Sequence, residues 1–244
     1  MSVWSEIGQF LTRFAGDGFA ALVERVRDAY QQNRAARNRV AFSIAIIALS
    51  AKMAKADGVV TEDEVSAFRD IFEVPAQEMD NVSRLYNLAK QDIAGYDTYA
   101  AQVRSLFPQE NPDDRDVLHD VLDGLFHIAK ADGVLHENEI LFLEDISARF
   151  GFDEATFQRV RNRHAYGAGL NPYAVLGIER GTDIKTLRRH YHKRVAECHP
   201  DRLIARGVPP EFVRIASDRL ATLNAAWEEI EADLATRDAL EDAG

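Results

Sequence analysis

Apolar residues along most of the chain recur every three or four positions, and few segments alternate apolar with polar residues. This is the spacing of amphipathic helices that pack one face on a core, so the pattern predicts an all-α protein. The longest apolar run, residues 40 to 51, includes two serines. It is too short to span a bilayer and is typical of a buried helix.

Before this run, residues 1 to 40 predict one or two amphipathic helices that end in a basic stretch containing Arg34, Arg37 and Arg39. We interpret this segment as a surface helix that covers the following domain. The alternative is a helix that binds a membrane surface or a partner protein.

A twelve-residue segment occurs twice, 75 positions apart. Residues 54 to 65 are AKADGVVTEDEV and residues 129 to 140 are AKADGVLHENEI, with eight identities. Apolar helical stretches flank both copies, and neither copy can bury its apolar faces alone. We therefore expect residues 41 to 165 to form one domain from two helical hairpins that pack together.

Each copy contains Asp-Gly followed by a glutamate, which resembles the second half of a calcium loop. The first and third ligand positions of such a loop hold Met53 and Lys55 in one copy, and Ile128 and Lys130 in the other, which excludes an EF-hand. The alternative is structural: glycine stops one helix and a capping box starts the next. His136 is a poorer cap in the second copy.

Acidic groups of the two turns could still converge across the repeat and bind a divalent ion or a basic partner. The candidates are Asp57, Glu62, Glu64, Asp132, Glu137 and Glu139. We favour capping and solvation for them. On these repeated segments, residues 41 to 165 resemble the TerB-like (tellurite-resistance B) helical family. The resemblance implies an all-helical interaction or stress-associated module with an acidic patch and no established catalysis.

After a short linker at 166 to 170, a helix with two distinct faces is predicted from about residue 184. Its apolar stripe comprises Ile184, Leu187, Tyr191, Val195 and Cys198. Its other face is densely positive, and no acid occurs between residues 185 and 194. Because like charges repel on a helix surface, this arrangement favours an anionic partner over a merely solvated face. The basic face contains Lys185, Arg188, Arg189 and His192, with Lys193 at its edge.

Pro200 is expected to help end this helix, followed by a loop over residues 203 to 208. Pro209 and Pro210 then start a second long helix. Its apolar stripe runs from Phe212 to Ile230 at spacings of three and four, which predicts an antiparallel hairpin with coiled-coil-like packing. The hairpin would present His199, Pro200 and Asp201 at its tip.

Residues 171 to 235 resemble a J-domain of the DnaJ family. The resemblance lies in NPYAVLGI at 171 to 178, the basic helix, His199-Pro200-Asp201 and LNAAWEEI at 223 to 230. A TerB-like domain followed by such a J-domain, with the longer loop HPDRLIARGVPPEF, resembles the DjlA-like co-chaperones. This resemblance implies that the basic helix docks on a DnaK-type ATPase chaperone and that the HPD tip accelerates its ATP hydrolysis. The implied partner-binding residues are Lys185, Arg188, Arg189, His192, Lys193, Arg194, His199, Pro200 and Asp201.

Composition and the absence of known motifs argue against several other classes of function. The chain has 29 Lys and Arg against 40 Asp and Glu, a net charge of −11, which disfavours nucleic acid and anionic membranes. A single cysteine, Cys198, fits a reducing compartment. We find no nucleophile–base pair, glycine-rich phosphate loop or zinc signature, and residues 1 to 40 lack the membrane span typical of DjlA-like proteins. We expect a cytoplasmic protein that is not an enzyme and needs no cofactor.

The principal prediction is a co-chaperone whose TerB-like domain directs client or location. The alternative is a stress-associated scaffold, or a divalent-metal-binding TerB-like protein, whose J-domain only recruits a chaperone. The acidic residues at 236 to 244 are expected to form a frayed tail.

Overall fold

The computed structural model describes residues 3–13, 18–57, 76–92, 94–107, 112–130, 133–165 and 171–241, and these contain helices and no strand. The predicted all-α class is confirmed. The N-terminal helices are α1 (Val3–Arg13), α2 (Phe19–Ala29), α3 (Arg34–Asp57), α5 (Met79–Gln91), α6 (Tyr96–Ser105), α7 (Pro112–Ala129), α8 (Glu137–Phe150) and α9 (Glu154–Ala165), with a 3-10 turn η1 (Ala76–Glu78). The C-terminal ones are α10 (Pro172–Leu176), α11 (Ile184–Glu197), α12 (Pro200–Arg206), η2 (Pro210–Phe212) and α13 (Val213–Glu241).

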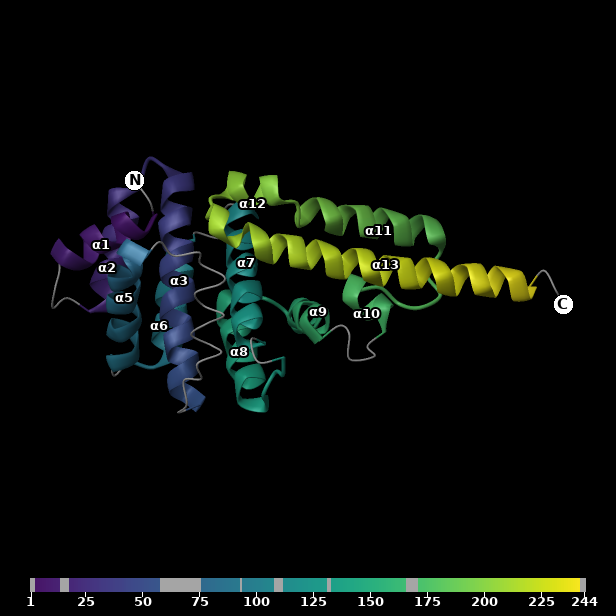
Figure 1. Cartoon of the computed structure of the whole chain (residues 1–244), viewed down its shortest axis with the longest axis horizontal. Coiled ribbons are helices and arrows are strands. Elements are labelled where there is room, and N and C mark those ends of the chain that lie inside the picture. The colour runs from purple at the N-terminus through teal and green to yellow at the C-terminus, as the bar shows by residue number, and fades with distance from the viewer. Residues whose placement is uncertain are drawn as a thin grey trace.

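Helix α3 is the centre of a helical bundle that occupies one end of the molecule (Figure 1). Its apolar run is buried along nearly its whole length, from Val40 to Ala54. A helix that is apolar on all sides must be covered on all sides. The covering elements are α1, α2, α5, α6, α7 and α8, all of which contact α3.

Helices α1 and α2 belong to this bundle. Trp4, Ile7 and Phe19 are fully buried in the same hydrophobic core as α3. The basic stretch lies on the first turns of α3 and is paired within the molecule: Arg37 Nη2 lies 2.9 Å from Asp114 Oδ2 on α7, and Arg39 reaches Glu6 on α1 at 3.5 Å. These contacts agree with a segment that covers the adjoining domain, and they leave little of the basic stretch for a membrane or partner.

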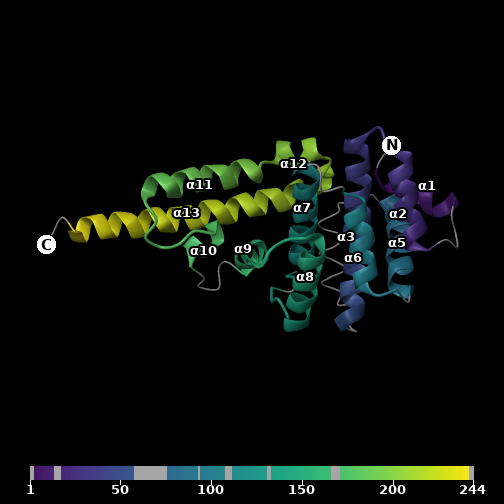
Figure 2. The same ribbon diagram turned by 180° about the vertical axis from the view of Figure 1, so that it is seen from behind.

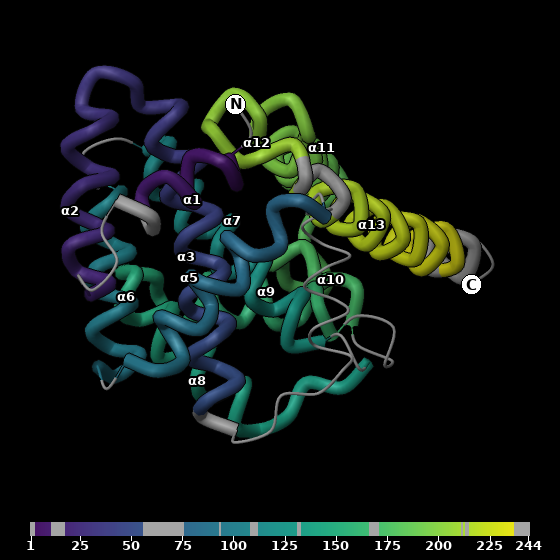
Figure 3. Tube along the Cα trace, turned by 60° about the vertical axis from the view of Figure 1, so that its left-hand side comes forward, coloured from purple at the N-terminus to yellow at the C-terminus, as the bar shows by residue number. Residues whose placement is uncertain are grey.

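Helices α11 and α13 form an antiparallel pair that extends away from the bundle (Figure 2). Figure 3, turned by 60° about the vertical axis, shows α13 leading away from the bundle. A second, separate hydrophobic cluster seals this hairpin with the short helix α10. It contains Tyr173, Val175, Leu176, Leu187, Cys198, Leu223, Ala226, Trp227 and Ile230.

The N-terminal part of α13 does not seal the hairpin. Ile215 and Ala216 of α13 belong to the core of the bundle, as do Phe212 of η2, Leu203 and Val208. The predicted stripe from Phe212 to Ile230 is therefore divided: its first part packs on the bundle and its later part packs on α11. One continuous helix thus joins the two hydrophobic cores.

Candidate functional site

Helix α11 begins at a side-chain cap. Asp183 Oδ1 accepts a hydrogen bond from the Thr186 backbone N–H at 2.9 Å, which satisfies one of the otherwise free donors at the helix start. The hydrogen bonds from Thr186 hold the pKa of the Asp183 carboxyl below its ordinary value. The carboxylate therefore stays ionised near the positive end of the helix dipole.

The apolar side of α11 packs on α13. Leu187 is fully buried, and the Tyr191 ring stacks on Trp227 at 4.7 Å between centroids. The Tyr191 hydroxyl lies 2.8 Å from Asn224 Oδ1 and donates to it. Ile184, at the first turn, is 42% exposed and lies outside the buried cluster. Because this apolar side of α11 packs on α13, the opposite side of α11 points away from α13.

The opposite side of α11 is the basic face predicted from the sequence, formed by Lys185, Arg188, Arg189, His192 and Lys193, all of which are exposed. Within the described part of the chain, the first four have no carboxylate within ion-pair distance, and Lys193 reaches Glu197 only at 3.9 Å. Helices α10 and α13 are the elements that α11 contacts most. Both flank its apolar side, so the basic face is open to solvent and to a partner.

Arg194 differs from its neighbours. Its Nη1 donates to Glu197 Oε2 at 2.9 Å, and its side chain lines a cavity between the hairpin and the bundle. Arg194 is predicted to bind the partner together with these neighbours, but the charges along a helix do not by themselves give the direction of one side chain. The structure separates Arg194 from the open basic face.

The tripeptide His199-Pro200-Asp201 forms the start of a helix, α12. His199 is its N-cap, Pro200 occupies the first helical position and Asp201 adds an acid to the first turn, an order that suits a helix N-terminus. The His199 and Asp201 side chains are 53% and 88% exposed. The predicted presentation of this tripeptide outside the hydrophobic interior agrees with these exposures.

The imidazole of His199 is oriented by its own backbone. Nδ1 accepts a hydrogen bond from the Asp201 backbone N–H at 3.2 Å. A neutral imidazole that accepts at Nδ1 carries its proton on Nε2. The structure gives Nε2 no partner among the described residues, so this N–H can donate to another molecule.

The prediction of a loop over residues 203 to 208 is wrong. Residues 200 to 206 form helix α12, which ends at Gly207 in the left-handed conformation, with φ of +93°. Leu203 is buried in the bundle core and α12 contacts α3 and α7. A proline disfavours continuation of the preceding helix but is also well suited to the first turn of a new one, and Pro200 does both here.

A buried ionic network joins α12 and α13 to the bundle. Arg206 on α12 donates to Asp116 at 2.8 Å and to Asp120 at 3.0 Å. Arg219 on α13 donates to Asp120 at 3.0 Å and to Asp123 at 2.5 Å. The network fixes the HPD-bearing helix relative to the bundle.

The two central carboxylates of this network differ: burial outweighs Arg219 and Arg206 at Asp120 and raises its pKa, whereas pairing dominates at Asp123. Burial alone raises the pKa of Asp123, but the guanidinium groups of Arg163 and Arg219 outweigh it and hold that pKa well below its usual range. Arg163 and the His164 ring also contact the same carboxylate, the latter at 3.1 Å. These residues were not among the predicted site residues. Their signal in the sequence is weak: aspartates recur on α7 among apolar positions, where a buried acid needs a partner.

The lysines of the two repeated segments have equivalent structural roles. Lys55 Nζ donates to the carbonyl of Asp92, just after α5, at 3.1 Å. Lys130 Nζ donates to the carbonyl of His164, in the last turn of α9, at 2.5 Å. A cation at a helix C-terminus satisfies carbonyls that have no intrahelical partner. In the second copy, Gly133 has φ of +90°, as a left-handed helix stop requires.

Of the six acidic residues considered as metal ligands, the structure describes the side chains of two, Glu137 and Glu139. Glu139 is buried and its carboxylate accepts from the His136 backbone N–H at 2.9 Å, so it forms half of a capping box that starts α8. His136 thus caps the helix with help from Glu139. Glu137 lies in the first turn of α8. Glu62, Glu64, Asp132 and the Asp57 side chain lie outside the described residues, and the described ones contain no group of three His, Cys, Asp or Glu suited to a metal ion.

The family-model match and the most similar curated proteins agree with each other. Residues 43–162 match the family model of the tellurite resistance protein TerB. The co-chaperone protein DjlA of Photobacterium profundum is 31% identical over 215 residues, covering 78% of this chain and 76% of the relative. DjlA of Legionella pneumophila is 25% identical over 77% of this chain and 75% of its own, and DjlA of Vibrio vulnificus is 26% identical over 79% and 78%.

No solved structure matches the chain significantly. Among the helices that are described, each is either too short or too polar to cross a bilayer. The relatives, the TerB match and the exposed His199-Pro200-Asp201 turn beside a basic helix agree on a DnaJ-type co-chaperone. The chain belongs to the DjlA family of co-chaperones.

Proposed function

We propose that this co-chaperone binds a DnaK-type ATPase chaperone and stimulates its ATP hydrolysis through His199-Pro200-Asp201 and the basic face of α11. The supporting observation is that an exposed imidazole and an exposed carboxylate stand at the start of α12, at the end of a helix whose cations are largely unpaired among the described residues. Such a surface suits an acidic partner.

The basic face would act first. Exposed charges that match an opposite charge on a partner mainly raise the association rate and select the orientation. Lys185, Arg188 and Arg189 would attract the acidic surface, and the turn at His199 would then contact it. The Nε2–H of His199 can donate to the partner, and the Asp201 carboxylate can accept from it.

The bundle would hold this turn in place. Leu203 is anchored in the bundle core, and Arg206 binds both Asp116 and Asp120 on α7. We propose that the TerB-like bundle also directs the client or the location of the co-chaperone. A cytoplasmic location is part of the proposal and is supported by the unpaired Cys198.

Single-turnover ATP hydrolysis by a cognate DnaK-type chaperone tests this function. The wild-type chain should accelerate hydrolysis, and His199→Gln should abolish the acceleration. Because His199 also caps α12, His199→Asn is the informative second variant: asparagine is a good N-cap but supplies no imidazole. It should fold normally and still fail to stimulate.

A matched pair of aspartate variants gives the control. Asp201→Asn removes the exposed carboxylate of the turn, whereas Asp218→Asn removes an exposed carboxylate on α13. The first should lose stimulation and the second should retain it. Equal stimulation by wild type, His199→Asn and Asp201→Asn would show that the turn does not act on the ATPase.

A further inference from the structure

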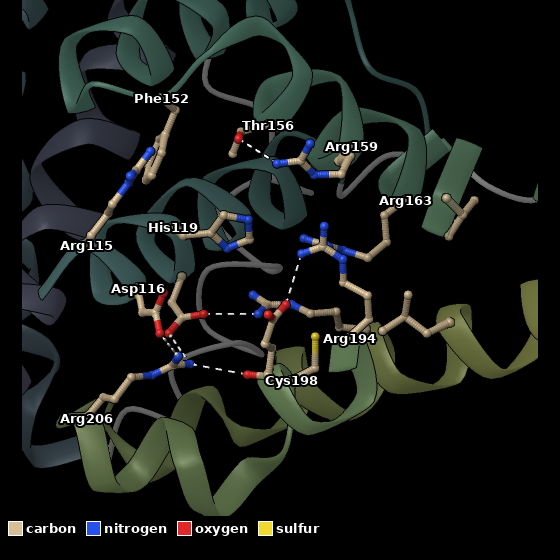
Figure 4. A pocket seen from close by; sticks show the side chains of 15 residues that line it. Arg115, Asp116, His119, Phe152, Thr156, Arg159, Arg163, Arg194, Cys198 and Arg206 are labelled. Atoms are coloured by element: carbon tan, nitrogen blue, oxygen red, sulfur yellow. Dashed lines mark hydrogen bonds and ion pairs between the residues drawn. The ribbon is translucent and has the colours of Figure 1, made fainter. Parts of the chain in front are cut away.

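A cavity of about 290 Å³ lies where the hairpin meets the bundle (Figure 4). Its lining comes from both parts of the molecule, including His119 on α7, Phe152 before α9 and Cys198 at the end of α11. Six of the lining residues are arginines, contributed by α7, α9, α11, α12 and α13: Arg115, Arg159, Arg163, Arg194, Arg206 and Arg219. Such a concentration of guanidinium groups is unusual in a chain with a net charge of −11.

Four of these arginines have carboxylate partners, in the pairs and network given above, and two do not. Arg159 Nη2 donates to the Thr156 hydroxyl at 2.6 Å, and the Arg115 guanidinium lies 5.7 Å from the Phe152 ring centroid. Neither reaches a carboxylate within ion-pair distance in the part of the chain that the structure describes. The lining therefore has more cations than its acids neutralise.

Even the paired arginines keep unused donors. The Nε atoms of Arg163 and Arg206 are buried and have no hydrogen-bond partner among the described residues. The two side chains are only 10% and 7% exposed. A buried N–H on a charged group that lacks an acceptor is costly, so these two guanidinium groups are only partly satisfied by the described residues.

The guanidinium groups also repel one another. Burial and the neighbouring Arg194 and Arg163 lower the pKa of Arg159, and the attraction of Asp153 and Glu197 does not offset them. Figure 4 shows the side chains of His119, Arg159 and Arg163 directed toward the same space. An anion placed among these groups would relieve their repulsion.

We propose that this cavity is a binding site for a phosphate group, held by Arg159, Arg163 and Arg194 with Arg115 at its side. Phosphate presents several acceptor oxygens and up to two negative charges, which match the planar donor fork of arginine. The volume lies at the lower limit of ligand pockets, so it suits a phosphate ion or the phosphate end of a small molecule.

The acidic C-terminal region of the chain is a poor alternative occupant. Helix α13 begins beside the bundle and extends away from it, so that its end at Glu241 lies at the far end of the molecule (Figure 1). The acidic end of α13 is therefore not the occupant, and the proposed ligand is a separate anion.

Occupancy would connect the two parts of the protein. Arg159 and Arg163 belong to α9 of the bundle, whereas Arg194 belongs to α11 of the hairpin. Glu197 and Cys198 line the cavity and directly precede His199. A phosphate shared by both sides would strengthen the docking of the hairpin and hold the HPD turn more firmly.

Titration calorimetry and thermal unfolding with sodium phosphate test the proposal, using sodium chloride at the same ionic strength as the reference. Phosphate should bind saturably and raise the melting temperature beyond the effect of chloride. Arg159→Gln and Arg115→Gln should each weaken binding by on the order of tenfold or more, because each removes a charge-assisted contact. Arg188→Gln, on the open face of α11, should bind like wild type.

O-phosphoserine, tested in the same way, distinguishes the source of the phosphate. Binding of both probes indicates a cavity that admits the phosphate of a larger molecule, and binding of inorganic phosphate alone indicates the free ion. If circular dichroism shows that Arg159→Gln is unfolded, Arg115→Gln and Arg194→Gln decide by the same criterion. An effect of phosphate no greater than that of chloride, or one unchanged in the cavity variants, overturns the proposal.

Discussion

Arg219 on α13 donates from Nη1 to Asp120 Oδ1 on α7 at 3.0 Å, and both side chains are almost completely buried. The two residues are 99 positions apart in the chain and belong to the two different modules. Their contact, with that of Arg219 to Asp123, attaches the DnaJ-like hairpin to the TerB-like bundle. The hairpin is therefore held against the bundle at a defined place.

Removing the charge of Arg219 should destabilise the protein strongly. Arg219→Gln leaves Asp120 and Asp123 buried with less compensation, and breaking one side of a buried ion pair costs about 3–5 kcal/mol. Urea unfolding of this variant beside Arg188→Gln, which removes an exposed arginine, measures the loss. A loss below about 1 kcal/mol for Arg219→Gln would mean that the network contributes little to stability.

Gly207 offers a test of the contact between α12 and α3. Gly207 and Gly181 both have positive φ, +93° and +100°, but only Gly207 is enclosed: an added Cβ would lie 2.6 Å from the Ala35 carbonyl oxygen. Gly181→Ala should cost about 1–2 kcal/mol for the left-handed backbone alone. Gly207→Ala should cost about 1–3 kcal/mol more, because α12 must move away from α3.

Thermal unfolding of the two alanine variants gives the comparison. The Gly207 variant should also stimulate the partner ATPase less, since the displaced helix begins with His199. Equal destabilisation by the two substitutions would contradict the close packing of Gly207 on α3.

Stability should fall as the pH is lowered through the histidine range. Burial lowers the pKa of the His164 imidazole despite its contact with Asp123, and burial also lowers that of His119, where Arg219 and Arg163 add to the effect. In the unfolded chain a histidine titrates near 6.5, so the unfolded state takes up protons first. The stabilisation is thus present above about pH 6.5 and is lost as the pH falls toward the lower folded values.

The free energy of unfolding, measured from pH 8 to pH 5, checks this sign. Each such group contributes a slope of at most about 1.4 kcal/mol per pH unit. His164→Gln and His119→Gln should each make the curve shallower below pH 6.5. Variants that follow the wild-type slope would contradict the assignment to these two histidines.

Reversing charge on the open face of α11 should slow partner association. Arg188→Glu with Arg189→Glu replaces two exposed cations by acids, which removes electrostatic attraction to an acidic surface. Stopped-flow association at low salt should show a slower rate for this variant, and added salt should reduce the difference from wild type. Normal association of the variant at low salt would mean that the basic face is only solvated.

The duplicated Asp-Gly turns are not expected to bind a divalent ion, because Glu139 is already used as a helix cap. Calorimetry with calcium, magnesium and zinc should therefore give no saturable heat that depends on the turns. Binding that disappears in Asp57→Asn with Asp132→Asn would instead support the metal-binding alternative.

The sequence alone was sufficient where the information is local. Apolar spacing predicted α11 and the long helix that follows it along the chain. The basic face of α11 follows from the geometry of a single helix, and so does the separation of Arg188 from Leu187. The His199-Pro200-Asp201 motif was also evident, since its order along the chain is distinctive.

Only the tertiary structure decided how the modules meet. It showed that residues 200 to 206 form a helix buried against the bundle, that Phe212 and Ala216 pack there, and that Arg194 turns toward the cavity. Periodicity identifies an apolar face but does not say which core the face will join. Pairs such as Asp120 with Arg219 depend on helix directions set by the whole packing, so the arginine-lined cavity emerged only once both hydrophobic cores were assembled.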